Sequence, residues 1–231
     1  MIIFRYSLKR NLKQPIVLIS NFALPIALMF ISGFWQEGNW STLPFGVGVL
    51  SMILMFTAFI LSKNIEQDRL EGTITRFQLA PITSLQYLWQ NLLASIVPLF
   101  TLNLIVTGLG MVMYNWSLGF SVLLFVSLSI FTSSCVALSY AWSNLIPSQE
   151  ASLAVFSVVM TFASMLSGAL MPLEYMPFPL NRLGAIFPSF WFMQGLGSLI
   201  EEGVGVQFFV ANGIVLVLTF IFLLLGAKRK K

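Results

Sequence analysis

The chain has 231 residues, of which 58% are hydrophobic and only 9% are charged, and its formal net charge is +4. A soluble domain carries about 25% charged residues, so this composition excludes an ordinary soluble protein and predicts an all-α integral membrane protein. Histidine is absent and Cys135 is the single cysteine, which excludes an intrachain disulfide and a Cys/His metal site. We expect residues 1–231 to form one membrane domain.

Residues 1–15 place basic side chains among apolar ones, ahead of a long apolar run. That run continues to Phe34 without the small-residue cleavage pattern of a signal peptide, so we interpret it as a retained helix. Two interpretations of residues 1–15 stay open. They form an interfacial amphipathic helix whose basic side chains face anionic headgroups, or they form a frayed basic arm.

Six apolar segments approach the length of about 20 residues that a spanning helix needs. Short polar turns separate them, and aromatic residues of the kind found at membrane interfaces flank these turns, as Trp35 and Trp40 flank Glu37. A second such turn is Tyr114–Ser117. The predicted spans are about 16–34, 43–62, 85–113, 118–141, 151–171 and 206–227.

The basic residues predict the orientation of these spans. If both termini lie inside, the internal segments hold eleven of the twelve Lys and Arg residues, and only Arg182 lies outside. This asymmetry follows the rule that cytoplasmic loops are enriched in Lys and Arg. The internal basic residues are Arg5, Lys9, Arg10, Lys13, Lys63, Arg69, Arg76 and Lys228 to Lys231.

The segment 63–84, between the second and third spans, is polar and longer than a simple turn requires. Leu70, Ile74 and Phe77 are spaced to share one face of a helix, Gly72 bends or divides that helix, and Pro81 ends it. Two hypotheses stay open here: a solvated helix that packs on its own membrane domain, or a docking element for a soluble partner.

The segment 172–205, between the fifth and sixth spans, has an unusual composition. Its four prolines and Arg182 exclude a straight span, yet it is too apolar for a free external loop. We expect two short helices that dip into the outer leaflet and pack against protein. The alternative is an interfacial lid with no role in transport.

Three stretches of the sequence resemble ABC-2 type transporter permeases. Glu66 to Thr73 followed by Pro81-Ile82-Thr83 resembles the acidic-Gly-Thr…Pro segment of that family, and Arg10 to Pro15 with Leu24-Pro25 resembles the start of its first span. Gly168 to Pro172, with Met176-Pro177 and Phe187-Pro188, resembles the pattern around its fifth span. The resemblance implies docking on a separate ATPase by Glu66, Asp68, Arg69, Leu70, Glu71, Gly72, Thr73, Phe77 and Pro81. It implies a re-entrant extracellular segment that involves Gly168, Pro172, Met176, Pro177, Arg182 and Pro188.

The residues that are missing narrow the function further. No phosphate-binding loop of the Gly-x-x-x-x-Gly-Lys-Ser/Thr type occurs, so we do not expect this chain to hydrolyse ATP. No charge lies in the middle of a predicted span, which argues against a proton-coupled carrier, and the absence of histidine argues against a hydrolase. The neutral polar residues of the third and fourth spans, such as Asn103 and Thr132, are expected to link helices.

The resemblance therefore implies the membrane subunit of an ATP-driven exporter in a bacterial plasma membrane, surrounded by membrane lipids. It implies a homodimer, or a heterodimer with a second permease, and two copies of an ATPase subunit that bind ATP and Mg²⁺. For this chain we expect no catalytic residue, no bound metal or cofactor, and no nucleic-acid partner. The expected substrate is amphipathic or hydrophobic: a drug, an antimicrobial peptide or a lipid-like molecule. The alternative is a membrane scaffold or sensor without transport, or a passive pore.

Overall fold

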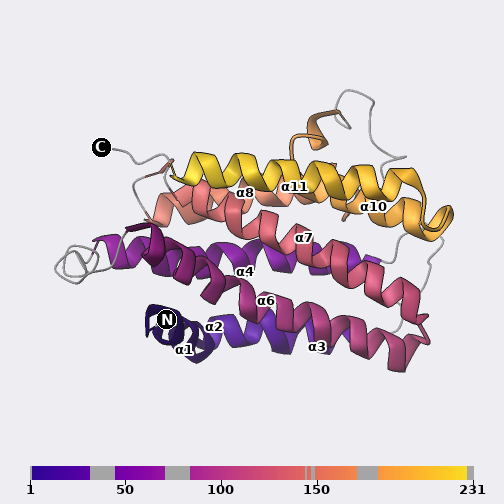
Figure 1. Ribbon diagram of the computed structural model, residues 1–231, viewed down its shortest axis with the longest axis horizontal. Helices are drawn as coiled ribbons and strands as arrows, with labels where there is room; N and C mark the ends of the chain where they lie inside the picture. The colour runs from indigo at the N-terminus through magenta and orange to yellow at the C-terminus, as the bar shows by residue number, and fades with distance from the viewer. Residues whose placement is uncertain are drawn as a thin grey trace.

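A computed structural model describes residues 2–31, 45–70, 84–143, 145–146, 149–170 and 182–227. Helices and short connections make up these residues, and no strand occurs among them. The long helices lie side by side along the long axis of the molecule (Figure 1). The prediction of an all-helical fold is therefore confirmed for the part of the chain that the structure describes.

The first span is predicted as one helix over 16–34, but the structure divides its described part. After α1 (Ile2–Lys13), the chain forms α2 (Pro15–Leu18), the π-helical η1 (Ile19–Ala23) and α3 (Leu24–Met29). The axis bends by 75° between α1 and the segment Pro15–Met29. The remaining helices are α4 (Phe45–Leu70), α6 (Ser84–Tyr114), α7 (Leu118–Ser143), α8 (Gln149–Leu166), α10 (Pro188–Glu201) and α11 (Val206–Ala227).

Four of the described helices, α4, α6, α7 and α11, are long and apolar enough to cross a membrane. A fifth span results if α1 and the segment Pro15–Met29 are counted together. Helix α8 is apolar but shorter than the other four, because it ends at Leu166 and not at the predicted residue 171. The described helices thus give four or five spans by length and composition, and the predicted number of six remains a prediction.

The turn predicted at Tyr114–Ser117 is present and has a clear physical basis. Asn115 adopts a positive φ of 53°, a conformation that asparagine tolerates better than most residues. The ring of Trp116 lies directly against Gly110, where a larger side chain would collide with it. The hydroxyl of Tyr114 donates a hydrogen bond to the carbonyl of Met29 and so joins the end of α6 to the end of α3.

Helices α4 and α7 form the centre of the bundle. Helix α7 packs against α4, α6, α10 and α11. In the apolar stretch of each helix, 67% of the residues of α4 are buried but only 28% of those of α11, so α11 lies at the periphery.

Buried polar side chains join neighbouring helices: the amide of Asn103 donates to the hydroxyl of Thr132 (2.9 Å), and the hydroxyl of Ser127 donates to the amide oxygen of Asn212 (2.9 Å). This agrees with the expected role of these residues as links between helices.

Several helix ends gather at one end of the bundle. Helix α1, the end of α4, the start of α6, the start of α8 and the end of α11 lie at the same end in Figure 1. The connection between α10 and α11 lies at the opposite end. Successive long helices therefore alternate in direction along the bundle, as an antiparallel membrane domain requires.

Candidate functional site

The first candidate region is the end of α4, which leads into the predicted docking segment. The apolar part of α4 ends at Lys63, close to the predicted end of the span at about residue 62, and the helix itself continues to Leu70. The backbone of Glu66, Asp68, Arg69 and Leu70 thus belongs to the helix that runs through the centre of the bundle. The other docking candidates, Glu71, Gly72, Thr73, Phe77 and Pro81, lie outside the described residues.

Aromatic rings link this end of α4 to two other helices. Phe59 of α4 stacks on Phe156 of α8, with ring centroids 4.0 Å apart. Phe56 and Trp142 meet the edge of the same Phe156 ring, at 6.1 Å and 5.6 Å. We call Phe56, Phe59, Trp142 and Phe156 the aromatic cluster. The Nζ atom of Lys63, one turn further along α4, lies 5.5 Å from the centroid of the Phe59 ring. These four rings therefore join the part of α4 next to Lys63 to α7 and α8.

A second linkage joins the N-terminal helices to α6, and it centres on Pro98. Proline has no N–H, so Pro98 leaves the carbonyl of Ala94 without its normal helical donor. The side-chain amide of Asn11, in α1, donates a hydrogen bond of 3.1 Å to that carbonyl. The amide of Asn21, in η1, donates one of 3.0 Å to the carbonyl of Pro98 itself.

Asn11 and Asn21 are residues whose role the sequence analysis missed. Both are buried, with relative exposures of 2% and 0%. The only sequence signal for such contacts is a proline inside an apolar helix, which implies that another group must satisfy the freed carbonyl. Because their partners lie 83 and 77 positions away, the pairing itself could not be predicted.

The predicted re-entrant segment is described in part. Pro172, Met176 and Pro177 lie outside the described residues. Gly168 has a positive φ of 82°, which glycine adopts without strain, and it turns the chain after α8. Arg182 is exposed at the start of a short helical turn that precedes α10. Pro188 is buried in the first turn of α10, where its missing N–H needs no partner.

A close contact fixes the turn after α8 against the beginning of α4. A Cβ atom placed on Gly48 would lie 1.8 Å from the carbonyl oxygen of Ala169, so only glycine fits there. Gly195 of α10 faces α11 less tightly, because a Cβ atom placed on it would lie 3.0 Å from the Cβ atom of Ala211. The first contact packs the turn after α8 against α4, and the second packs α10 against α11.

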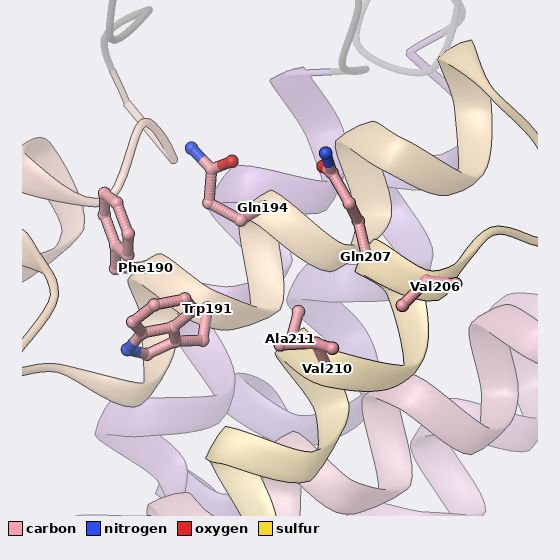
Figure 2. Close-up of a pocket in the computed structure, with 7 residues that line it drawn as sticks. All are labelled: Phe190, Trp191, Gln194, Val206, Gln207, Val210 and Ala211. Atoms are coloured by element: carbon pink, nitrogen blue, oxygen red, sulfur yellow. The ribbon is translucent and has the colours of Figure 1, made fainter.

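The α10–α11 hairpin carries a hollow of about 390 Å³. Figure 2 shows that Gln194 and Gln207 project to the same side of the hairpin, and the aromatic rings of Phe190 and Trp191 lie beside them. The indole nitrogen of Trp191 donates a hydrogen bond of 2.8 Å to the carbonyl of Ala185, which fixes its ring. The hollow is completed by Val206, Val210 and Ala211. An apolar floor with two amide groups suits an amphipathic molecule better than a charged one.

Metal-ligating side chains and the single cysteine were the remaining candidates for a chemical site. Among the described residues, no group of three His, Cys, Asp or Glu side chains lies close enough to hold a metal ion. Cys135 is buried within α7, so its packing is that of a small apolar residue.

Comparison with known families identifies the kind of membrane protein. No curated protein is significantly similar to this chain. A family model described as "ABC-2 family transporter protein" matches residues 11–228. This match extends over all the described helices except α1, of which it includes only the end, and it agrees with an all-helical chain that has several apolar spans. The chain therefore belongs to the ABC-2 family of transporter proteins and is a membrane permease.

Proposed function

We propose that this chain is the membrane subunit of an ATP-driven exporter, and that a separate ATPase subunit docks on the segment that follows α4. The observation that carries the proposal is the continuity of α4, which runs from the centre of the bundle to Leu70, inside the predicted docking segment. The aromatic cluster supports it, because it connects the same end of α4 to α7 and α8. Family membership supports a transport role.

The proposed complex contains two permease chains, as a homodimer or as a heterodimer with a second permease, and two ATPase subunits that bind ATP and Mg²⁺. Closure of the ATPase subunits moves the docking segment, and α4 carries this movement into the bundle. The ATPase drives the change only if its contacts with the permease differ between the inward-facing and outward-facing states. The proposed substrate is an amphipathic or hydrophobic molecule such as a drug, an antimicrobial peptide or a lipid-like compound.

The docking assignment is tested with the variant Leu70→Ala/Phe77→Ala. Apolar anchors of an interface each contribute roughly 2 kcal/mol or more, so the double variant should no longer retain the ATPase when the permease is purified from membranes. The matched control is Leu118→Ala, which removes a leucine that is 70% exposed at the other end of the bundle. Substitution of Asp68 or Glu71 should mainly slow association, because charges at the edge of an interface act on the encounter rate.

Retention of the ATPase, with unchanged transport, by a Leu70→Ala/Phe77→Ala protein that reaches the membrane would refute the docking assignment. Loss of membrane insertion would favour a helix that packs only on its own bundle. A permease that never copurifies with an ATPase would favour a scaffold or a passive pore. Stimulation of ATP hydrolysis in the purified complex by candidate compounds would then identify the substrate class.

A further inference from the structure

One face of α1 is exposed and basic, although the helix itself is fixed to the bundle. Arg5, Lys9 and Lys13 are exposed along this face. Two more exposed side chains lie among them, Tyr6 at 69% and Leu12 at 38% relative exposure. We call these five residues the α1 basic face.

The opposite side of α1 is held against α6 by three hydrogen bonds at successive turns. The backbone N–H of Phe4 donates to the side-chain oxygen of Gln90 (3.2 Å). The hydroxyl of Ser7 donates to the side-chain amide oxygen of Asn91 (2.6 Å). The amide of Asn11 donates to the carbonyl of Ala94 (3.1 Å). Because these contacts fix the rotation of α1 about its axis, the α1 basic face always points away from α6.

The direction of α1 places this face at the level of a membrane surface. The helix is bent by 75° from the segment Pro15–Met29, and Figure 1 shows it nearly end-on while the long helices lie in the plane of the view. Trp89, next to Gln90, is the first residue of the apolar part of α6 and is 53% exposed. Exposed tryptophans at the end of a span are typical of the headgroup region of a membrane. If α6 crosses the membrane, α1 lies nearly parallel to its surface at the depth of Trp89.

We propose that the α1 basic face is a binding surface for the headgroups of anionic phospholipids. The three basic side chains supply donors and positive charge for lipid phosphates, and Leu12 and Tyr6 supply apolar contact with the upper part of the acyl chains. An acidic protein surface would match the charges but not the exposed leucine at this depth. Unlike a disordered basic arm, this surface has a fixed geometry, and it does not depend on the identity of the transported substrate.

The proposal is tested with the full chain purified in uncharged detergent and offered equal amounts of phosphatidylglycerol and phosphatidylcholine. Native mass spectrometry measures which lipid stays bound. We expect the natural sequence to prefer phosphatidylglycerol, and Arg5→Gln/Lys9→Gln/Lys13→Gln to lose a preference on the order of a hundredfold, since each basic residue contributes roughly fivefold. The matched control Arg5→Lys/Lys9→Arg/Lys13→Arg keeps the charges and should keep the preference.

A second measurement does not depend on any variant. Phosphatidylglycerol should raise the Tm of the natural protein more than phosphatidylcholine does, and this difference should shrink when salt rises from about 0.1 M to about 1 M. Equal retention of the two lipids by the natural protein, or an unchanged preference in the triple Gln variant, would overturn the proposal. Loss of a copurifying ATPase in that variant, with the lipid preference intact, would instead assign the surface to a protein partner.

Discussion

At the scale of single residues, the clearest feature is the way a neighbouring asparagine compensates for Pro98. A proline in a helix interior costs roughly 3 kcal/mol, in part because it leaves a carbonyl unsatisfied. Within a membrane no water replaces the missing donor, so a neighbouring side chain must do so. Asn11 supplies that donor to Ala94, and Asn21 adds a bond to the carbonyl of Pro98. The N-terminal helices therefore supply the donor that Pro98 removes from α6.

This interpretation predicts a specific coupling between Asn11 and Pro98. Asn11→Leu should lower the free energy of unfolding by about 1–3 kcal/mol, because it leaves the buried carbonyl of Ala94 without its side-chain donor. In a Pro98→Ala background the helix restores the N–H at position 98, so the same substitution should cost much less. Reversible unfolding of the four proteins in mixed micelles measures the coupling. Additive effects would show that Asn11 stabilises the fold in another way.

A second prediction at this scale concerns Gly48. Gly48→Ala should lower the free energy of unfolding by about 1–3 kcal/mol, because its Cβ would collide with the backbone carbonyl of Ala169. The matched control is Gly108→Ala in α6, where a Cβ meets nothing within 4 Å. That control should raise the stability by about 0.5–1 kcal/mol, since alanine favours a helix over glycine. Thermal unfolding of the purified variants compares them, and equal effects would contradict the packing argument.

At the scale of elements, α4 is the helix best placed to carry movement through the bundle. It is the most buried of the four long apolar helices, and it continues into the predicted docking segment as far as Leu70. The rings that α4 contributes to the aromatic cluster lie within two turns of Lys63, and the cluster joins α4 to α7 and α8. Under the proposed function, these rings transmit the force that the ATPase applies.

Phe156 is the ring through which this transmission is tested. Phe156→Ala should lower the free energy of unfolding by about 3–5 kcal/mol, and the milder Phe156→Leu should lower transport while the ATPase still binds. The control is Phe162→Leu on the same helix, because Phe162 is 60% exposed and lies outside the cluster. Vesicle transport and copurification separate the two effects. If Phe156→Leu and Phe162→Leu behave alike, the cluster does not couple the helices.

The sequence predicted most of the helices because apolar length and polar aromatic turns are local signals. Helices α6, α7 and α11 begin and end within about two residues of the predicted positions. The apolar part of α4 ends at Lys63, next to the predicted end of the span at about residue 62, and the helix continues to Leu70, within the segment whose residue spacing is typical of a helix. The contacts of Asn11, Asn21 and Phe156 depend on packing between distant segments, and no local pattern encodes them.

At the scale of the whole molecule, the arrangement of helix ends agrees with the distribution of basic residues. The exposed basic residues Arg5, Lys9 and Lys13 lie in α1, at the end of the bundle where α11 also ends, and exposed Arg182 precedes α10. The bundle therefore has one end with most of its described cations and one end with the hairpin of α10 and α11. We therefore expect the basic end to lie in the cytoplasm, as the enrichment of Lys and Arg in cytoplasmic segments predicts.

The orientation is tested by single cysteines introduced into a Cys135→Ala background. Lys13→Cys should react with a membrane-impermeant maleimide only after the cells are opened, whereas Glu202→Cys, exposed after α10, should react in intact cells. Glu37→Cys and Glu174→Cys extend the test to the two predicted outer segments, and both should react from outside. The same variants test the number of spans, because an odd number between residues 13 and 37 and an even number between residues 37 and 202 are required. Reaction of Lys13→Cys in intact cells without reaction of Glu202→Cys would show the opposite orientation in the membrane. That orientation would place the segment after α4 on the side of the membrane without ATP.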